Sequence, residues 1–153
     1  MIAARVFVVL HALVALALGG ASTHLALVTY GLYRHDPPPK AKLRLARIYS
    51  QTVGWLFIAV VILGSFAYPA YRYRVRGLYL DRHAPWAANL FDFKETLAAL
   101  ALPIAIALIV LGRRYEPADR DVRALFAFCA GAVFCTVAFN IVSGLVITLV
   151  RGV

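Results

Sequence analysis

Charged side chains are scarce in this sequence, and acidic ones are the scarcest. Only 15% of the 153 residues are charged, and seven acids stand against sixteen Lys and Arg, so the formal net charge is +9. A soluble domain of this size carries about a quarter charged residues. With 63% hydrophobic residues, the chain holds more apolar side chain than so small a bundle buries in water. Lipid must cover the excess, and the sequence predicts an integral membrane protein.

The motifs of the common enzyme classes are also missing. The sequence has no HExxH, no GxSxG, no Walker loop and no Rossmann fingerprint, and no cluster of metal ligands. We therefore expect no independent catalytic activity. The basic residues come without a groove-reading motif and stand at the edges of apolar segments, where they meet lipid headgroups. We expect membrane lipids, and no nucleic acid, as partners.

Cysteine is rare as well, with Cys129 and Cys135 the only two. On a helix, six residues separate them by roughly 9 Å along the axis, which is too far for a disulfide. The spacing is also not that of a CxxC motif. We expect both to be small packing residues.

Four long apolar segments fill most of the chain, with the polar residues gathered between them. They predict a single all-α domain over residues 1–153, a bundle of four transmembrane helices with short loops. The predicted spans are about residues 6–33, 48–69, 90–111 and 124–150. The first residues, up to Leu18, also have the pattern of a signal peptide, but the apolar run continues past Ala21, which favours a retained helix.

The connections carry signals for helix ends. Pro37, Pro38 and Pro39 end the first segment. The longest connection, residues 71–89, is rich in Arg and Tyr, so we expect a loop or surface helix in the headgroup layer, or else a docking surface for an acidic soluble partner. Asn89 is the predicted N-cap of the third helix, with Asp92 three residues on. Pro103 predicts a kink in that helix.

Basic residues in the short loops predict the orientation. The connections after the first and third segments hold nine: Arg34, Lys40, Lys42, Arg44, Arg47, Arg113, Arg114, Arg120 and Arg123. The opposite side holds seven: Arg5, Arg72, Arg74, Arg76, Arg82, Lys94 and Arg151. This bias predicts that both termini lie outside. The membrane that we expect is a bacterial inner membrane.

Two histidines, His11 and His24, lie within the first apolar segment. An ionisable group at membrane depth is a functional candidate, and imidazole is the ligand that holds haem in membrane b-type cytochromes. Gly20 and Gly31 share the stripe of His24 and would let a macrocycle or another helix come close. Thirteen residues turn a helix by roughly 220°, so His11 and His24 point to different sides.

A haem b site on this helix would need a further ligand, because no other segment offers a central histidine. That ligand would come from a second protein chain, a symmetric dimer or another residue type. The alternatives for these histidines are a hydrogen bond within the bundle and a proton relay.

Two more sets of polar residues lie in the predicted spans. Asp92, Lys94 and Glu95 open the third helix, where the helix dipole and snorkelling account for them. A proton entry or a quinone headgroup site is the functional alternative. The second set follows one face of the fourth helix and predicts helix packing with interhelical hydrogen bonds, or else a ligand cleft or proton wire. It comprises Thr136, Asn140, Ser143, Gly144 and Thr148.

These residues support three hypotheses. The first is a subunit of a respiratory or redox complex that binds b-type haem for electron transfer; in architecture alone, the chain resembles small four-helix membrane cytochromes. The second is a non-catalytic accessory or assembly subunit, with lipid bound between its packing surfaces and those of a partner. The third is a small oligomeric proton or solute transporter that uses His11, Glu95 and Asn140. Each predicts other membrane subunits or copies of the chain as partners.

Overall fold

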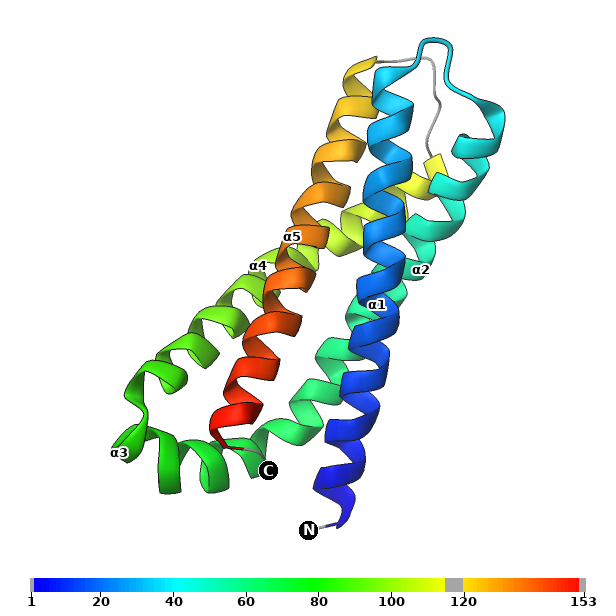
Figure 1. Ribbon diagram of the computed structural model, residues 1–153. Coiled ribbons are helices and arrows are strands. Elements are labelled where there is room, and N and C mark those ends of the chain that lie inside the picture. The colour runs from blue at the N-terminus through cyan, green and yellow to red at the C-terminus, as the bar shows by residue number, and fades with distance from the viewer. Residues whose placement is uncertain (1, 115–119, 152–153) are drawn as a thin grey trace.

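The computed structural model describes residues 2–114 and 120–151, and every regular element in this part of the chain is a helix. Four of the helices are long and apolar enough to cross a membrane. They are α1 (Ile2–Arg34), α2 (Lys40–Ala70), α4 (Pro85–Arg114) and α5 (Arg120–Val150). The predicted four-helix, all-α architecture is confirmed (Figure 1).

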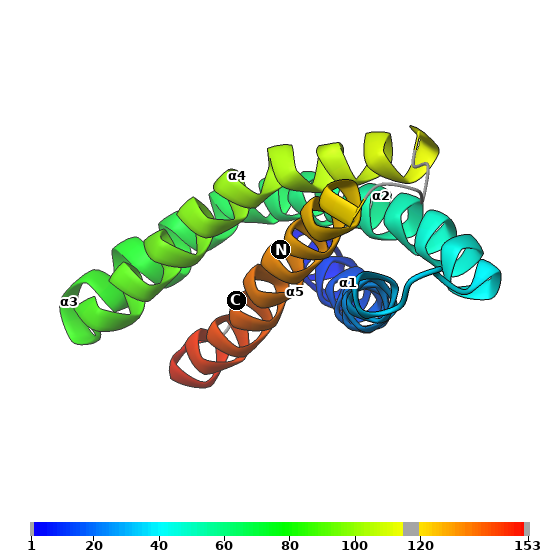
Figure 2. The same cartoon turned by 90° about the horizontal axis from the view of Figure 1, so that it is seen from above.

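The four helices form a ring in which each packs against two neighbours. α1 lies between α2 and α5, and α4 packs on the same two helices from the other side (Figures 1 and 2). The start of α1 and the end of α5 lie together at one end of the bundle, called here the termini end. The turn at residues 35–39 marks the opposite end, called the loop end.

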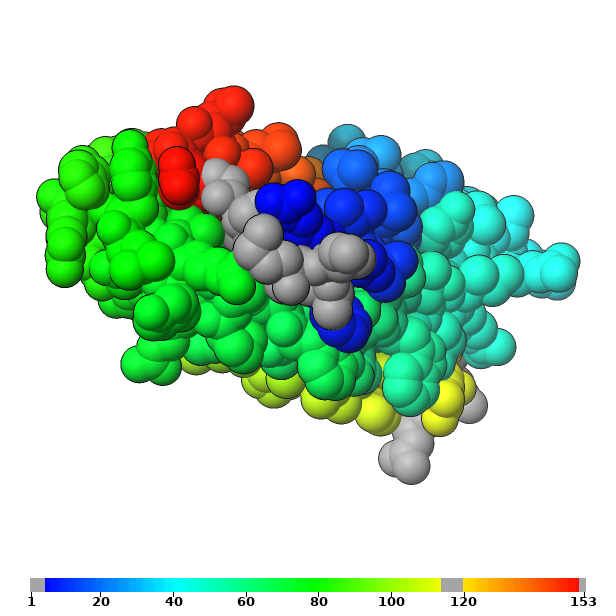
Figure 3. All heavy atoms as spheres, turned by 90° about the horizontal axis from the view of Figure 1, so that it is seen from below, coloured from blue at the N-terminus to red at the C-terminus, as the bar shows by residue number. Residues whose placement is uncertain are grey.

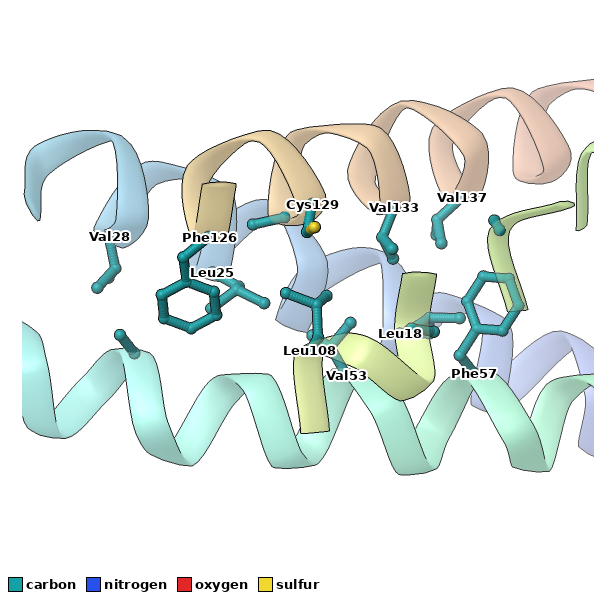
Figure 4. Packing of buried hydrophobic residues seen from close by; sticks show 14 of the residues in the cluster. Leu18, Leu25, Val28, Val53, Phe57, Leu108, Phe126, Cys129, Val133 and Val137 are labelled. Carbon is teal, nitrogen blue, oxygen red and sulfur yellow. The ribbon is translucent and has the colours of Figure 1, made fainter. Parts of the chain in front are cut away.

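The main core is built from apolar side chains of all four helices (Figure 4). Leu25, Val53, Leu108, Phe126 and Val133 are almost completely buried in it. Two glycines set the close approach of α2 to α4. A Cβ at Gly54 would collide with the side chain of Ile109, and one at Gly112 would collide with Ser50. Small residues let membrane helices gain van der Waals contact by close packing.

Large apolar side chains also cover the outside of the bundle. The exposed fractions of Leu27, Phe128 and Leu149 are 68%, 70% and 88%. Exposed apolar surface on this scale needs a non-aqueous environment. Lipid around the bundle supplies that environment, as the composition predicted.

The connection between the second and third spans is helical and continues α2. A π-helix, η1 (Tyr71–Leu80), extends α2 without a break, and the short α3 (Asp81–His83) follows it. η1 leads away from α1 towards the start of α4 (Figure 1). Of the two forms that the sequence left open for residues 71–89, the loop is therefore wrong for most of the segment.

The predicted start of the third helix is also wrong. α4 begins at Pro85, four residues before Asn89, so Asn89 lies inside the helix and caps nothing. Proline suits the first turn of a helix and excludes the residue before it from helical geometry, and Ala84 is indeed non-helical. Pro103 lies within α4, which stays one continuous helix from 85 to 114. Both cysteines are free, as predicted.

Candidate functional site

Polar side chains gather at the termini end, where the end of α2 continues into η1 and η1 packs against the start of α4. Lys94 is the central residue of this group, because it belongs to the row of α4 side chains that faces the inside of the bundle. That row contains Phe91, Lys94, Ala98, Ala101, Ala105 and Leu108. Lys94 is half-buried, and its Nζ lies 4.7 Å from the centroid of the Phe91 ring. Among the described residues, no hydrogen bond or ion pair reaches this ammonium group.

Phe91 is also part of an aromatic stack. The centroids of the Tyr71 and Phe91 rings are 3.9 Å apart, and Tyr68 stacks on Phe91 at 6.2 Å. The Tyr71 hydroxyl is buried and has no hydrogen-bond partner within the described part of the chain. A buried polar group without a partner costs about 1–3 kcal/mol. Lys94 and Tyr71 are thus two donors without acceptors beside one aromatic ring.

Asp92 has a structural partner that the sequence did not indicate. Its carboxylate accepts two hydrogen bonds from Arg76 of η1, at 2.6 and 3.0 Å. The Arg76 Nε also lies 3.4 Å from Asp81. This bidentate pair joins η1 to the start of α4 and gives Asp92 a structural role. Glu95 is exposed on α4.

His11 is held against α2. Its Nδ1 lies 3.0 Å from the carbonyl oxygen of Val60. A carbonyl only accepts, so Nδ1 carries the proton and Nε2 keeps its lone pair. Gly64 makes room for the ring, since a Cβ there would lie 3.1 Å from His11 Cε1.

His24 lies in a different environment, exposed on α1, with its ring stacked on Tyr49 of α2 at 4.4 Å. Gly20 is also exposed, and nothing lies within 4 Å of the place where its Cβ would stand. Gly31 instead makes room for the side chain of Lys42, whose Nζ would lie 2.6 Å from such a Cβ. The structure therefore does not bring His24 and His11 to one site.

A shallow groove of about 350 Å³ runs between α1 and α5. Gly20 opens onto it, but neither histidine does. Most of its lining is apolar or small, and it is open to the side of the bundle. The lining residues are Leu16, Gly19, Gly20, Ser22, Thr23, Phe134, Ala138, Ile141 and Val142.

The polar stripe of α5 bonds to its own helix. Asn140 donates to the Thr136 carbonyl, Ser143 to Phe139 and Thr148 to Gly144, at 2.7 to 2.9 Å. Such bonds to the carbonyl four residues back satisfy a polar side chain within the helix. Interhelical hydrogen bonds were expected from this stripe, and none occurs among these donors in the described part of the chain.

The termini end thus offers an ammonium group and a buried hydroxyl beside stacked aromatic rings, and His11 lies separately against α2. Figure 3 views this end and shows η1, α3 and the start of α4 beside α1 and the end of α5. In the described ranges, no group of three His, Cys, Asp or Glu residues could hold a metal ion alone. Comparisons with protein-family models, curated proteins and solved structures found no match to this chain.

Proposed function

We propose that the chain is a membrane subunit of a respiratory or redox complex and that it binds haem b through His11. The observation that carries this proposal is the contact of 3.0 Å between His11 Nδ1 and the Val60 carbonyl. Metal-ligating histidines almost always donate their second ring N–H in this way, because the bond fixes the tautomer and raises the basicity of the ligating nitrogen. Nε2 of His11 would be the axial ligand of the iron.

A second protein ligand for the haem would come from outside this bundle. α2, α4 and α5 contain no histidine, and His24 lies on an exposed part of α1, away from His11. A second copy of the chain or another subunit supplies the ligand in this proposal.

The test is a dithionite-reduced minus oxidised spectrum of protein purified in mild detergent together with whatever co-purifies. We expect sharp alpha and Soret bands, which His11→Ala and His11→Gln both abolish. His83→Ala is the matched control, because His83 is exposed in α3 and contacts Tyr79 of η1, through its carbonyl and its ring; the bands of this variant should persist. A flat spectrum from the natively purified protein, or bands that survive both His11 substitutions, would sink the haem proposal.

A second candidate function is a non-catalytic accessory subunit, which the groove between α1 and α5 favours. Its small lining residues, Gly19, Gly20 and Ser22, suit the approach of an apolar chain or a lipid. In that case the Gly20→Leu variant loses its co-purifying partner, whereas Gly131→Leu, also in open space, retains it. Retention by both variants would argue against this use of the groove.

A further inference from the structure

We infer that the cluster of Lys94, Phe91 and Tyr71 binds the headgroup of a quinone. This inference deepens the redox function proposed above, but it rests on side chains other than the haem ligand. Its basis is the juxtaposition of two hydrogen-bond donors without acceptors, Lys94 Nζ and Tyr71 Oη, on one aromatic ring.

The donors define the chemistry of the ligand. Lys94 carries only donors, and the Tyr71 hydroxyl is buried with its hydrogen-bonding capacity unused. A ligand that bonds to both would therefore carry an acceptor, or a pair of acceptors. A quinone has a carbonyl oxygen at each end of a flat ring, and such a ring suits contact with aromatic side chains.

The local charge favours a neutral acceptor over a phosphate. Arg76, the nearest guanidinium, is already neutralised by Asp92 through two hydrogen bonds. Lys94 is then the cation of the cluster without a hydrogen bond or ion pair among the described residues; its acidic neighbour Glu95 is exposed. A phosphate is typically bound by several cations or by a bidentate arginine, whereas a single ammonium group suits a carbonyl oxygen.

The depth of the cluster fits a lipid-soluble ligand. Lys94 lies within the third span, two turns and more from its start at Pro85. Phe93, next to it, is 55% exposed towards the outside of the bundle. A headgroup at Lys94 would have apolar surface available for its isoprenoid tail.

The experiment titrates detergent-purified protein, with its co-purifying partners, with a short-tail benzoquinone and a short-tail naphthoquinone. Binding is followed by equilibrium dialysis, and endogenous quinone is quantified after solvent extraction. Lys94→Met removes the ammonium and keeps most of the stem, and Tyr71→Phe removes only the hydroxyl. We expect each to weaken binding about tenfold, the effect of one hydrogen bond to a buried donor.

The matched controls are Lys40→Met and Tyr73→Phe, at exposed positions outside the cluster; both should bind like the parent chain. Equal binding by parent, Lys94→Met and Tyr71→Phe overturns the inference, as does a parent that binds no quinone. Retention of anionic phospholipid that is lost in Lys94→Met, without quinone binding, identifies a lipid phosphate site instead and also overturns it. Haem content is read separately from the spectrum, so failure of either proposal is distinguishable from failure of the other.

Discussion

At the scale of single residues, the sequence located polar groups in the membrane but not their partners. His11 and Lys94 were identifiable because ionisable groups are rare in apolar segments. The Val60 carbonyl and Gly64, which hold His11, have no sequence signal, since any residue has a carbonyl and the spacing between helices is set by packing. The sequence predicts that the tyrosines of the connection at residues 71–89 lie in the headgroup layer. Only the fold shows that the Tyr71 hydroxyl is buried.

Glycines give the sharpest prediction at this scale. In Gly54→Ala, the new Cβ collides with Ile109 and lies 3.0 Å from the Ala105 carbonyl oxygen, so we expect a loss of about 1–3 kcal/mol from overpacking. Gly131→Ala places a Cβ in open space and should stabilise the helix by up to about 1 kcal/mol. Thermal unfolding in detergent measures both. Equal stability of the two variants would contradict the close approach of α2 and α4.

At the scale of elements, the apolar runs predicted four helices correctly but misjudged what joins the second and third. The segment from 71 to 80 alternates Tyr and Arg, which gives no helical period. It is helical because α2 continues through it and because its Val75 and Leu80 pack with Phe91 and Ile147. Long-range packing of this kind overrides local pattern.

The Arg76–Asp92 pair makes the junction of η1 and α4 testable. A double-mutant cycle of Arg76→Met and Asp92→Asn should show a coupling of about 0.5–1 kcal/mol in thermal unfolding, a modest value because both side chains are partly exposed. The control cycle combines Arg72→Met with Asp92→Asn. Arg72 lies over the Tyr68 ring, so we expect no coupling between it and Asp92. Zero coupling for Arg76 would mean that other contacts hold η1 against α4.

At the scale of the whole molecule, the structure separates two polar ends by an apolar middle. The loop end carries the turn at residues 35–39, while the termini end carries η1, α3 and both chain ends. The composition alone predicted a membrane protein, because so much apolar surface has no other environment. The four apolar segments with polar connections between them predicted the helices. The arrangement of helices around the ring was beyond the sequence, since all four spans are similarly apolar and their order depends on side-chain fit.

The central claim is that the chain crosses the membrane four times, which puts the His11 and Lys94 sites at membrane depth. The most direct measurement labels single cysteines with an impermeant maleimide in intact cells and in inverted vesicles, after Cys129→Ala and Cys135→Ala. Asp36→Cys reports the loop end and Tyr73→Cys the termini end, at positions that are 82% and 70% exposed. We predict that they label from opposite sides, and the bias of basic residues in the loops predicts that Tyr73→Cys is the one reactive in intact cells. Labelling of both positions from the same side would contradict the four crossings and the sites that depend on them.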